Sequence, residues 1–419
     1  MKKQVIVTTL LLIVPISGYA RNTNWLEQDT LTGNWGGYRQ QLTESGVTFE
    51  AVYTADYFSN RHGGERVGGA FLDNTDIITD VDAEKLLGWK GGRLYMYVLG
   101  DSGGSPSDYA GDFQGLDNID SPNTWKVYEF WYQQTFLKNE ASLRFGLYDL
   151  NSEFDVIETA GLFINSSFGI GPDFSQSGQN GPSIFPTTSV GLRLYYPLTP
   201  NVYAQAVVLD GVPGDLNDDR GTHIEFKKSD GVLTTAEFGY TQGMDEGGRN
   251  PYAKLALGVW RYSAKFDDLV DTNNLGQPVQ RDNNQGLYVL GEYAVYREAN
   301  DPDQGLNVFA RYGVANTDIN QIGSFLSFGV AYNGLLPGRD DDRIGVAVAK
   351  ATNGSKYKQA QAAAGQPVEN AETAVELTYR LNVFPWLVFQ PDVQWIINPG
   401  MNPELKNAFV IGVRTEVAF

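Results

Sequence analysis

Hydrophobic and polar residues alternate along most of this chain, from Val47 to the C-terminal Phe419. The last run is the clearest, because Phe409, Ile411 and Val413 alternate there with glycine and charged residues. Successive side chains of a β-strand point to opposite faces, so a period of two predicts strands with one apolar and one polar face. Sixteen such runs can be counted, near 47–57, 75–85, 92–100, 125–137, 140–150, 189–197, 201–210, 232–241, 252–263, 286–297, 305–314, 324–333, 343–350, 373–382, 386–396 and 407–419.

The connections between these runs also follow a rhythm. Those after the first, third, fifth, seventh, ninth and thirteenth strands are long, and the longest covers residues 151–188. Those after the fourth, sixth and fourteenth strands are very short. An even number of strands, with long loops at one rim and tight turns at the other, predicts an all-β fold, a transmembrane antiparallel β-barrel. A closed sheet suits lipid because it leaves no backbone group unpaired.

A soluble β-protein would alternate in the same way, so the pattern alone leaves that alternative open. The charge on the second face of the strands counts against it, because a soluble core cannot bury so many ionised groups. These charged positions are Asp80, Asp82, Glu129, Arg144, Arg193, Glu237, Glu292, Arg311, Glu376, Arg380 and Arg414.

The first twenty residues have the features of an export signal. Lys2 and Lys3 precede a short apolar stretch, and small residues, Gly18 and Ala20, follow it. This order predicts a signal peptide over residues 1–20, cleaved before Arg21. Beyond it, no apolar run is long enough for a transmembrane helix.

Residues 21–46 form a separate N-terminal segment before the barrel at 47–419. Within this segment, the sequence from Trp35 to Leu42 predicts a short helix that ends at Gly46. We expect the segment to lie in the periplasm, beside the tight turns.

Composition narrows the function classes. The chain has no cysteine, which excludes disulfides and thiolate metal sites. It has 31 basic and 50 acidic residues, a net charge of −19, which makes nucleic acid a poor partner. The two histidines, His62 and His223, fall in expected outer loops and suit no catalytic arrangement. We expect no enzymatic activity, cofactor or metal.

Several motifs carry a resemblance to a known family. They are LTGNWGGYRQQLTESGVTFEAVYTADYFSN, then RFGLYDLNSEFD (144–155), SQSGQNGPSIFPTTSVGLRLYYPL (175–198) and VYAQAVVLDGVPGD (202–215). Together they resemble the carbohydrate-selective porins of the OprB type, over essentially the whole chain beyond the signal peptide. The resemblance implies a sixteen-stranded outer-membrane channel for mono- or short oligosaccharides, surrounded by lipid and lipopolysaccharide and assembled as a homotrimer. A general diffusion porin without sugar preference and a secreted carbohydrate-binding β-protein remain as alternatives.

A channel that sorts solutes needs a constriction, and residues 151–188 are the only connection that the sequence suggests is long enough to reach the axis. We expect this loop to fold inward. Arginine forks and carboxylates suit sugar hydroxyls, and aromatic rings suit the apolar faces of sugars. The candidate lining and contact residues follow from the parity of the strands, except for one that the long loop itself carries: they are Arg144, Arg193, Glu129, Trp131, Glu50, Asp80, Arg311 and Arg414, with Glu153 from the loop.

Overall fold

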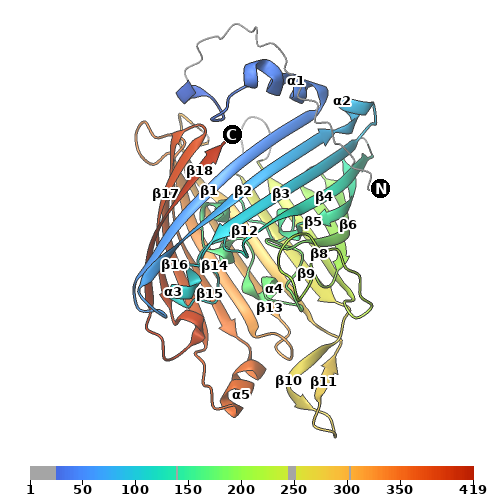
Figure 1. The fold of residues 1–419 in the computed structure, drawn as a ribbon, viewed down its shortest axis with the longest axis vertical. Coiled ribbons are helices and arrows are strands. Elements are labelled where there is room, and N and C mark those ends of the chain that lie inside the picture. Colours follow the sequence, from blue (N-terminus) through green and yellow to red (C-terminus); the bar gives the residue numbers. More distant parts are fainter. Residues whose placement is uncertain (1–24, 138–139, 244–251, 302) are drawn as a thin grey trace, which may run out of the picture.

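The computed structural model describes residues 25–419 except 138–139, 244–251 and 302, so the predicted signal peptide lies outside the described residues. In the described part, sixteen strands pair with their neighbours and close into one antiparallel barrel (Figure 1). The last strand pairs with the first to close the ring, from Val52 opposite Ala418 to His62 opposite Phe409. This confirms the predicted architecture and its number of strands. No helix in the described ranges is long and apolar enough to cross a membrane.

Each of the sixteen barrel strands overlaps one of the sixteen predicted runs. They are β1 (Val47–His62), β2 (Gly68–Asp82), β3 (Gly92–Gly103), β4 (Thr124–Phe136), β5 (Ala141–Tyr148), β6 (Ser189–Thr199), β7 (Val202–Asp210), β8 (Val232–Gln242), β9 (Ala253–Tyr262), β12 (Gln285–Arg297), β13 (Gly305–Ala315), β14 (Ile322–Asn333), β15 (Arg343–Asn353), β16 (Ala371–Phe384), β17 (Leu387–Ile397) and β18 (Ala408–Ala418). A separate hairpin consists of β10 (Phe266–Thr272) and β11 (Pro278–Arg281).

Short helices occupy the connections and the N-terminal segment. The α-helices are α1 (Tyr38–Ser45), α2 (Ala83–Leu87), α3 (Ser107–Ala110), α4 (Pro172–Ser175) and α5 (Ser355–Ala363). The 3-10 helices are η1 (Trp25–Glu27), η2 (Trp35–Gly37), η3 (Leu150–Ser152), η4 (Thr159–Leu162), η5 (Ser166–Phe168) and η6 (Pro399–Met401). The predicted N-terminal helix is therefore present as η2 and α1, and it ends at Gly46, whose φ of 97° allows the left-handed cap.

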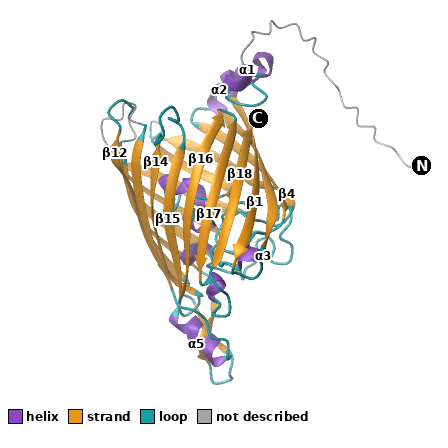
Figure 2. Cartoon of the chain, turned by 90° about the vertical axis from the view of Figure 1, so that its left-hand side faces the viewer, coloured by secondary structure: helices purple, strands orange, loops and turns teal. Residues whose placement is uncertain are grey.

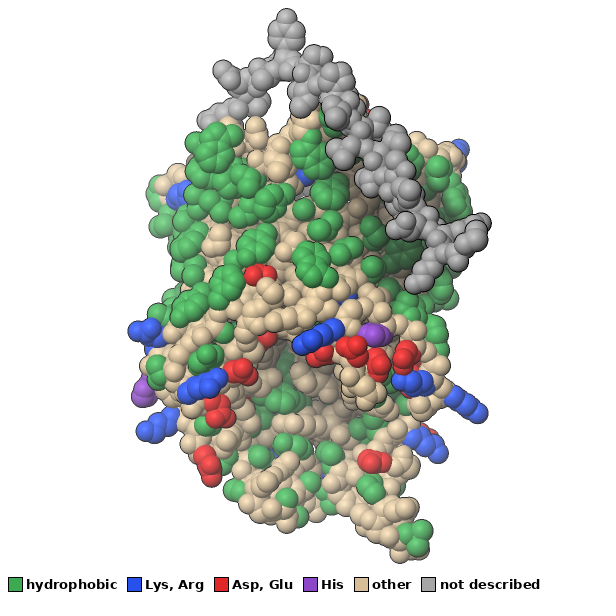
Figure 3. Space-filling model, in the orientation of Figure 1, with side chains coloured by type: hydrophobic (Ala, Val, Ile, Leu, Met, Phe, Trp, Pro, Cys, Tyr) green, Lys and Arg blue, Asp and Glu red, His purple; other side chains and the backbone are tan. Residues whose placement is uncertain are grey.

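The two faces of each strand differ as the alternation predicts. On β5, Phe145 points outward and is 60% exposed, whereas Arg144 points inward and is 8% exposed. Neighbouring strands repeat this arrangement, with Leu192 exposed and Arg193 buried on β6. On the face drawn in Figure 3, hydrophobic side chains gather over the upper part of the wall, and charged ones gather toward the lower end. The outer wall is therefore apolar, and the polar parity faces the interior.

The two ends of the barrel are unlike each other (Figure 2). One end, the turn rim, has short connections such as 200–201 and 385–386, and it also carries α1, α2 and the C-terminus. The other end, the loop rim, has the long connections 104–123, 149–188, 211–231, 263–284 and 354–370, with α5 and the β10–β11 hairpin projecting from it. The N-terminal segment is tied to the chain end, because Leu31 N–H donates to the carbonyl oxygen of Ala418 at 2.7 Å.

Two local predictions were wrong. The connection after the first strand is short, residues 63–67, because β1 and β2 remain paired as far as Asn60 opposite Gly68. Residues 83–85 are helical in α2, since the carboxylate of Asp82 accepts the backbone N–H groups of Glu84 and Lys85 at 3.0 and 3.1 Å and caps that helix.

Candidate functional site

The long loop at residues 149–188, hereafter the first inner loop, folds into the barrel as predicted. Three glutamate side chains of the wall accept hydrogen bonds from backbone N–H groups of this loop. Glu237 accepts the N–H of Asp155 at 3.0 Å, Glu292 those of Glu158 and Thr159 at 3.1 and 2.8 Å, and Glu376 those of Ile164 and Asn165 at 2.7 and 3.0 Å. Hydrogen bonds to a carboxylate are among the stronger ones in proteins, so these strands hold the loop against one side of the lumen.

An arginine on β13 fixes the same loop through two aspartates. The guanidinium of Arg311 donates to both carboxylate oxygens of Asp155, at 2.8 and 2.6 Å, and to Asp173 at 2.7 Å. Both aspartate side chains are fully buried. Burial raises the pKa of Asp155 to about 6, although the charge of Arg311 acts in the opposite direction. The sequence predicts Arg311 as a lumen contact, whereas the structure uses its guanidinium to hold the loop.

The side of the first inner loop that meets the wall is apolar. Phe174 stacks on Trp260 of β9 with ring centroids 5.0 Å apart and planes 3° apart. Phe163 packs on Phe309 of β13 at 5.8 Å. These side chains of the loop form a hydrophobic core with the wall. This core closes off the part of the lumen beside β9 and β13.

The connection at residues 104–123 is a second inner loop, which sequence reasoning missed. Glu372 of β16 accepts the N–H groups of Phe113 and Gln114 at 2.8 and 3.0 Å. Arg414 of β18 donates to Asp117 at 3.0 Å and to Asn118 at 2.6 Å, while it also pairs with Asp56 of β1 at 2.7 Å. Arg414 is therefore a tether for this loop. The expectation that only one loop reaches inward is wrong.

Three predicted residues form one ion cluster. Arg193 of β6 donates to both oxygens of Glu153, at 2.7 and 2.8 Å, and Arg144 of β5 lies 3.3 Å from the same carboxylate. Gln133 of β4 accepts from both guanidinium groups, at 2.8 Å from Arg193 and at 3.0 Å from Arg144. Arg193 is 2% exposed, whereas the Glu153 side chain is 25% exposed. The carboxylate thus faces the lumen, and Arg193 lies behind it.

Trp131 and Glu129 support this cluster from β4. Trp131 lies between the ring of Tyr95, stacked at 4.7 Å, and the guanidinium of Arg144, 3.8 Å from its centroid. Its indole N–H donates to Glu129 at 3.1 Å, and Glu129 also accepts the N–H of Asp149 at 3.0 Å. Trp131 is buried, so its flat face is not available to a solute; Tyr95 is partly exposed.

The remaining predicted residues, Glu50 and Asp80, lie toward the turn rim. Glu50 is exposed on the inward parity of β1. Asp80 accepts the Nε–H of Arg93, which lies 2.9 and 2.8 Å from its two carboxylate oxygens, and it also accepts from Nη2 of the same guanidinium. The predicted lining does not include Arg93. Strand pairing would have identified it, because Arg93 of β3 lies opposite Asp82 of β2, and paired residues share one face of the sheet.

A third exposed pair lies on the other side of the seam where β18 meets β1. Arg380 of β16 donates to the two oxygens of Glu416 of β18, at 2.7 and 2.5 Å, and both side chains are about a fifth exposed. Three arginine–carboxylate pairs therefore each have at least one partly exposed side chain: Arg144 of β5 with Glu153 of the first inner loop, Arg93 with Asp80, and Arg380 with Glu416.

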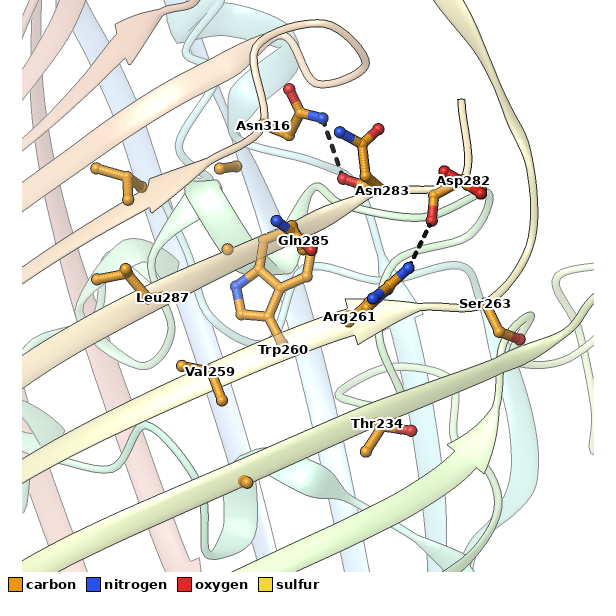
Figure 4. Close-up of a pocket in the computed structure, with 14 residues that line it drawn as sticks. Thr234, Val259, Trp260, Arg261, Ser263, Asp282, Asn283, Gln285, Leu287 and Asn316 are labelled. Carbon is orange, nitrogen blue, oxygen red and sulfur yellow. Dashed lines mark hydrogen bonds between the residues drawn. The ribbon is translucent and has the colours of Figure 1, made fainter. Parts of the chain in front are cut away.

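A large groove, about 1030 Å³, lies elsewhere, on the outer wall (Figure 4). Val259 and Leu287 line it with their outward side chains. At its polar end, Arg261 donates to the backbone carbonyl of Asp282 at 3.2 Å. This groove opens on the apolar face and contributes nothing to the constriction.

Within the described ranges, no group of three acidic, histidine or cysteine side chains is placed to hold a metal ion.

The comparisons with known proteins agree with this geometry. The family model described as carbohydrate-selective porin, OprB family, matches residues 66–419. Porin B of Pseudomonas aeruginosa is 26% identical over 434 residues, which cover 96% of this chain and 92% of that protein. The putative porin QuiX of Acinetobacter baylyi is 20% identical, over 94% of each chain.

Solved structures show the same fold. The high-pH structure of Pseudomonas putida OprB superposes with a TM-score of 0.83 at 23% identity, covering 94% of this chain and 99% of that one. The low-pH structure of the same protein gives a TM-score of 0.62 over the same shares. The chain therefore belongs to the OprB family of carbohydrate-selective porins and is an outer-membrane sugar porin.

Proposed function

We propose that small neutral carbohydrates diffuse passively through the part of the lumen that the inner loops leave open, between the walls β1–β6 and β16–β18. The observation that carries this proposal is the set of three arginine–carboxylate pairs, Arg144–Glu153, Arg93–Asp80 and Arg380–Glu416, each with at least one partly exposed side chain. Each pair offers donors and acceptors together, and its charges offset one another locally. Neutral hydroxyls gain from such an arrangement, and ions of either sign gain little.

Weak contacts are compatible with transport. A hydrogen bond exchanged with water contributes about 0.5–1.5 kcal/mol. A pore must release each solute that it binds, so several weak contacts along the passage serve conduction better than one tight site.

The candidate residues divide into two roles in this account. Glu153, Asp80 and Glu50 would meet the solute, together with Tyr95, whose ring can take the apolar face of a sugar, and Arg144 would reach it only at the edge of its guanidinium. The remaining predicted residues would position the constriction: Arg193, Glu129 and Trp131 support the ion cluster, and Arg311 and Arg414 tether the inner loops.

The surroundings of the pore are also proposed. Residues 1–20 would direct export and be removed before Arg21, and residues 21–46 would lie in the periplasm with the turn rim. Lipid and lipopolysaccharide would surround the apolar wall, and three copies would assemble as a homotrimer. No step of this function is enzymatic.

Planar-bilayer recordings test the constriction. Glu153→Gln keeps the shape of the side chain but leaves Arg144 and Arg193 without their shared carboxylate, so we expect lower cation preference and weaker block of the ion current by neutral monosaccharides. Glu404→Gln, at an exposed position of the loop rim, is the matched control. Unchanged sugar block in Glu153→Gln would remove Glu153 from the solute path and leave these pairs as wall charges.

A further inference from the structure

Large apolar side chains are exposed around the two helices of the turn rim. Leu87 is 70% exposed, Trp89 55% and Tyr38 54%. We call this set the turn-rim apolar surface, and it consists of Trp35, Tyr38, Leu42, Leu86, Leu87 and Trp89. Clusters of this kind mark surfaces that another phase or molecule covers.

This surface continues the outer wall and does not lie over the lumen. Trp35 packs on Phe49 of β1, with ring centroids 5.6 Å apart, and Trp89 packs on Tyr132 of β4 at 5.2 Å. Phe49 and Tyr132 face outward, because their sequence neighbours Glu50 and Trp131 face inward and successive side chains of a strand alternate. Both tryptophans therefore lie at the edge of the wall that meets lipid.

The two helices are joined to each other and to the end of the chain. The N–H of Asp82, the cap of α2, donates to the carbonyl of Gly46, the cap of α1, at 2.8 Å. Arg39 of α1 donates from Nη2 to the carbonyl oxygen of Phe419 and lies 4.5 Å from the ring centroid of Trp35. The helices are shown together at one end of the barrel in Figure 2. They therefore move with the barrel.

The distribution of polar groups matches a lipid boundary. Gln40 and Glu44 lie on the side of α1 away from Tyr38 and Leu42, joined by a hydrogen bond of 2.8 Å. Lys85 and Lys90 are exposed beside Leu86, Leu87 and Trp89. Tryptophan and tyrosine favour the headgroup level of a bilayer, and lysines flanking an apolar surface favour phospholipid phosphates.

We propose that α1 and α2 form an interfacial anchor, in which the turn-rim apolar surface rests in the headgroup region of the phospholipid leaflet on the periplasmic side. The anchor fixes the depth of the barrel next to the seam where β18 meets β1. This inference rests on the outer-membrane location of the chain and on its periplasmic turn rim, and it is independent of sugar selectivity.

The absence of cysteine allows a direct test with single introduced labels. Leu42→Cys and Leu87→Cys place an environment-sensitive fluorophore on the surface, and Glu44→Cys places it on the polar side of α1 as the matched control. The probe membrane is a vesicle of phosphatidylethanolamine and phosphatidylglycerol with no other protein. Each variant is compared in these vesicles with and without lipids that carry a nitroxide near the headgroup, and with iodide in the buffer.

We expect blue-shifted emission and strong nitroxide quenching at positions 42 and 87, and quenching by iodide at position 44. Emission typical of water at all three positions would overturn the anchor and leave the surface for a soluble partner. Equal lipid quenching at all three would also overturn it, because the polar side would then be immersed. A blue shift that disappears on dilution with lipid would assign the surface to a second copy of the chain, against the proposal.

Discussion

Arg311 and Asp155 join the barrel wall to the first inner loop through two parallel hydrogen bonds, at 2.8 and 2.6 Å. The guanidinium is 3% exposed and the carboxylate side chain is fully buried, so neither charge is stabilised by bulk water. Asp173 completes the arrangement from the same loop. An ion pair of this kind contributes little net stability, but removing one partner leaves the others buried and unpaired.

Arg311→Ala should therefore destabilise the folded protein by about 3–5 kcal/mol, because Asp155 and Asp173 lose their counter-ion. The first inner loop should also be released, with larger and noisier single-channel conductance. Arg311→Lys keeps the charge but not the two-pronged geometry, and should give an intermediate result. Denaturant unfolding and bilayer recordings measure the two effects. Wild-type conductance and stability in Arg311→Ala would show that the wall glutamates alone hold the loop.

Substitutions of Arg144 and Arg193 should have different effects on the channel. Arg193→Ala removes the two hydrogen bonds that Arg193 donates to Glu153 and loosens the loop, so ion conductance should rise. Arg144→Ala removes a donor from the lumen side of Trp131, so neutral-sugar block should weaken. The double variant should show both effects, and planar-bilayer recordings with added monosaccharide measure them. Arg261→Ala, on the outer wall, is the matched control. If the double variant behaves like this control, the constriction lies elsewhere.

Much of the fold could be predicted from the sequence because a barrel in lipid imposes period two on every strand. Phe145 and Arg144 show this on adjacent positions, one exposed and the other buried. Local chemistry limited the prediction at α2, where a single capping aspartate, Asp82, ends β2 and starts a helix. The β10–β11 hairpin was missed as well, since its strands are short and their few apolar residues do not alternate with polar ones.

The candidate site was harder to predict, for a physical reason. The cluster of Arg144, Arg193 and Glu153 could be predicted, because the two arginines lie on the strands that flank the long loop and Glu153 lies in that loop. Glu237 and Glu376 instead accept backbone N–H groups. Every residue except proline has such a group, so no side-chain pattern in the sequence identifies the residues that donate to these glutamates. Trp131 has inward parity, but only the structure reveals that the Tyr95 ring and the Arg144 guanidinium pack against its indole ring.

A positive charge on the outer wall should be costly. Phe145→Arg should destabilise the barrel in lipid vesicles by about 2–4 kcal/mol, since position 145 lies in the middle of β5 and faces the bilayer. Thr48→Arg, on the inward parity of β1, should be tolerated. Denaturant unfolding of both variants in the same vesicles gives the comparison. Equal cost at the two positions would mean that the assigned faces are inverted.

The projecting hairpin and α5 should stay joined in mild acid. Lys356 of α5 donates to Asp268 at 2.7 Å and to Asp271 at 2.8 Å, and Arg281 donates to Asp268 at 2.8 Å. Burial tends to raise the pKa of Asp268, but the hydrogen bonds from Lys356, from backbone N–H groups and from Arg281 hold it below the ordinary value of 3.8. A depressed pKa means that the stabilising contribution is complete above 3.8 and is lost as the pH falls further.

Spin labels at Leu275→Cys and Ala362→Cys measure this join as a distance distribution. We expect the same distribution at neutral pH and at about pH 5, and a broader one in strong acid. Lys356→Ala should broaden it at every pH. A change between neutral pH and mild acid in the otherwise unaltered chain would contradict the role given to Asp268.

Liposome swelling measures whether the paired charges in the lumen favour neutral sugars. Vesicles that contain the purified protein are exposed to a neutral monosaccharide, and separately to the sugar acid and the amino sugar with the same carbon skeleton. We expect the neutral sugar to enter fastest, and we expect Glu153→Gln to reduce the difference in entry rate between the neutral sugar and the two charged ones. Entry of the sugar acid or the amino sugar at the same rate as the neutral sugar, or faster, would contradict this expectation.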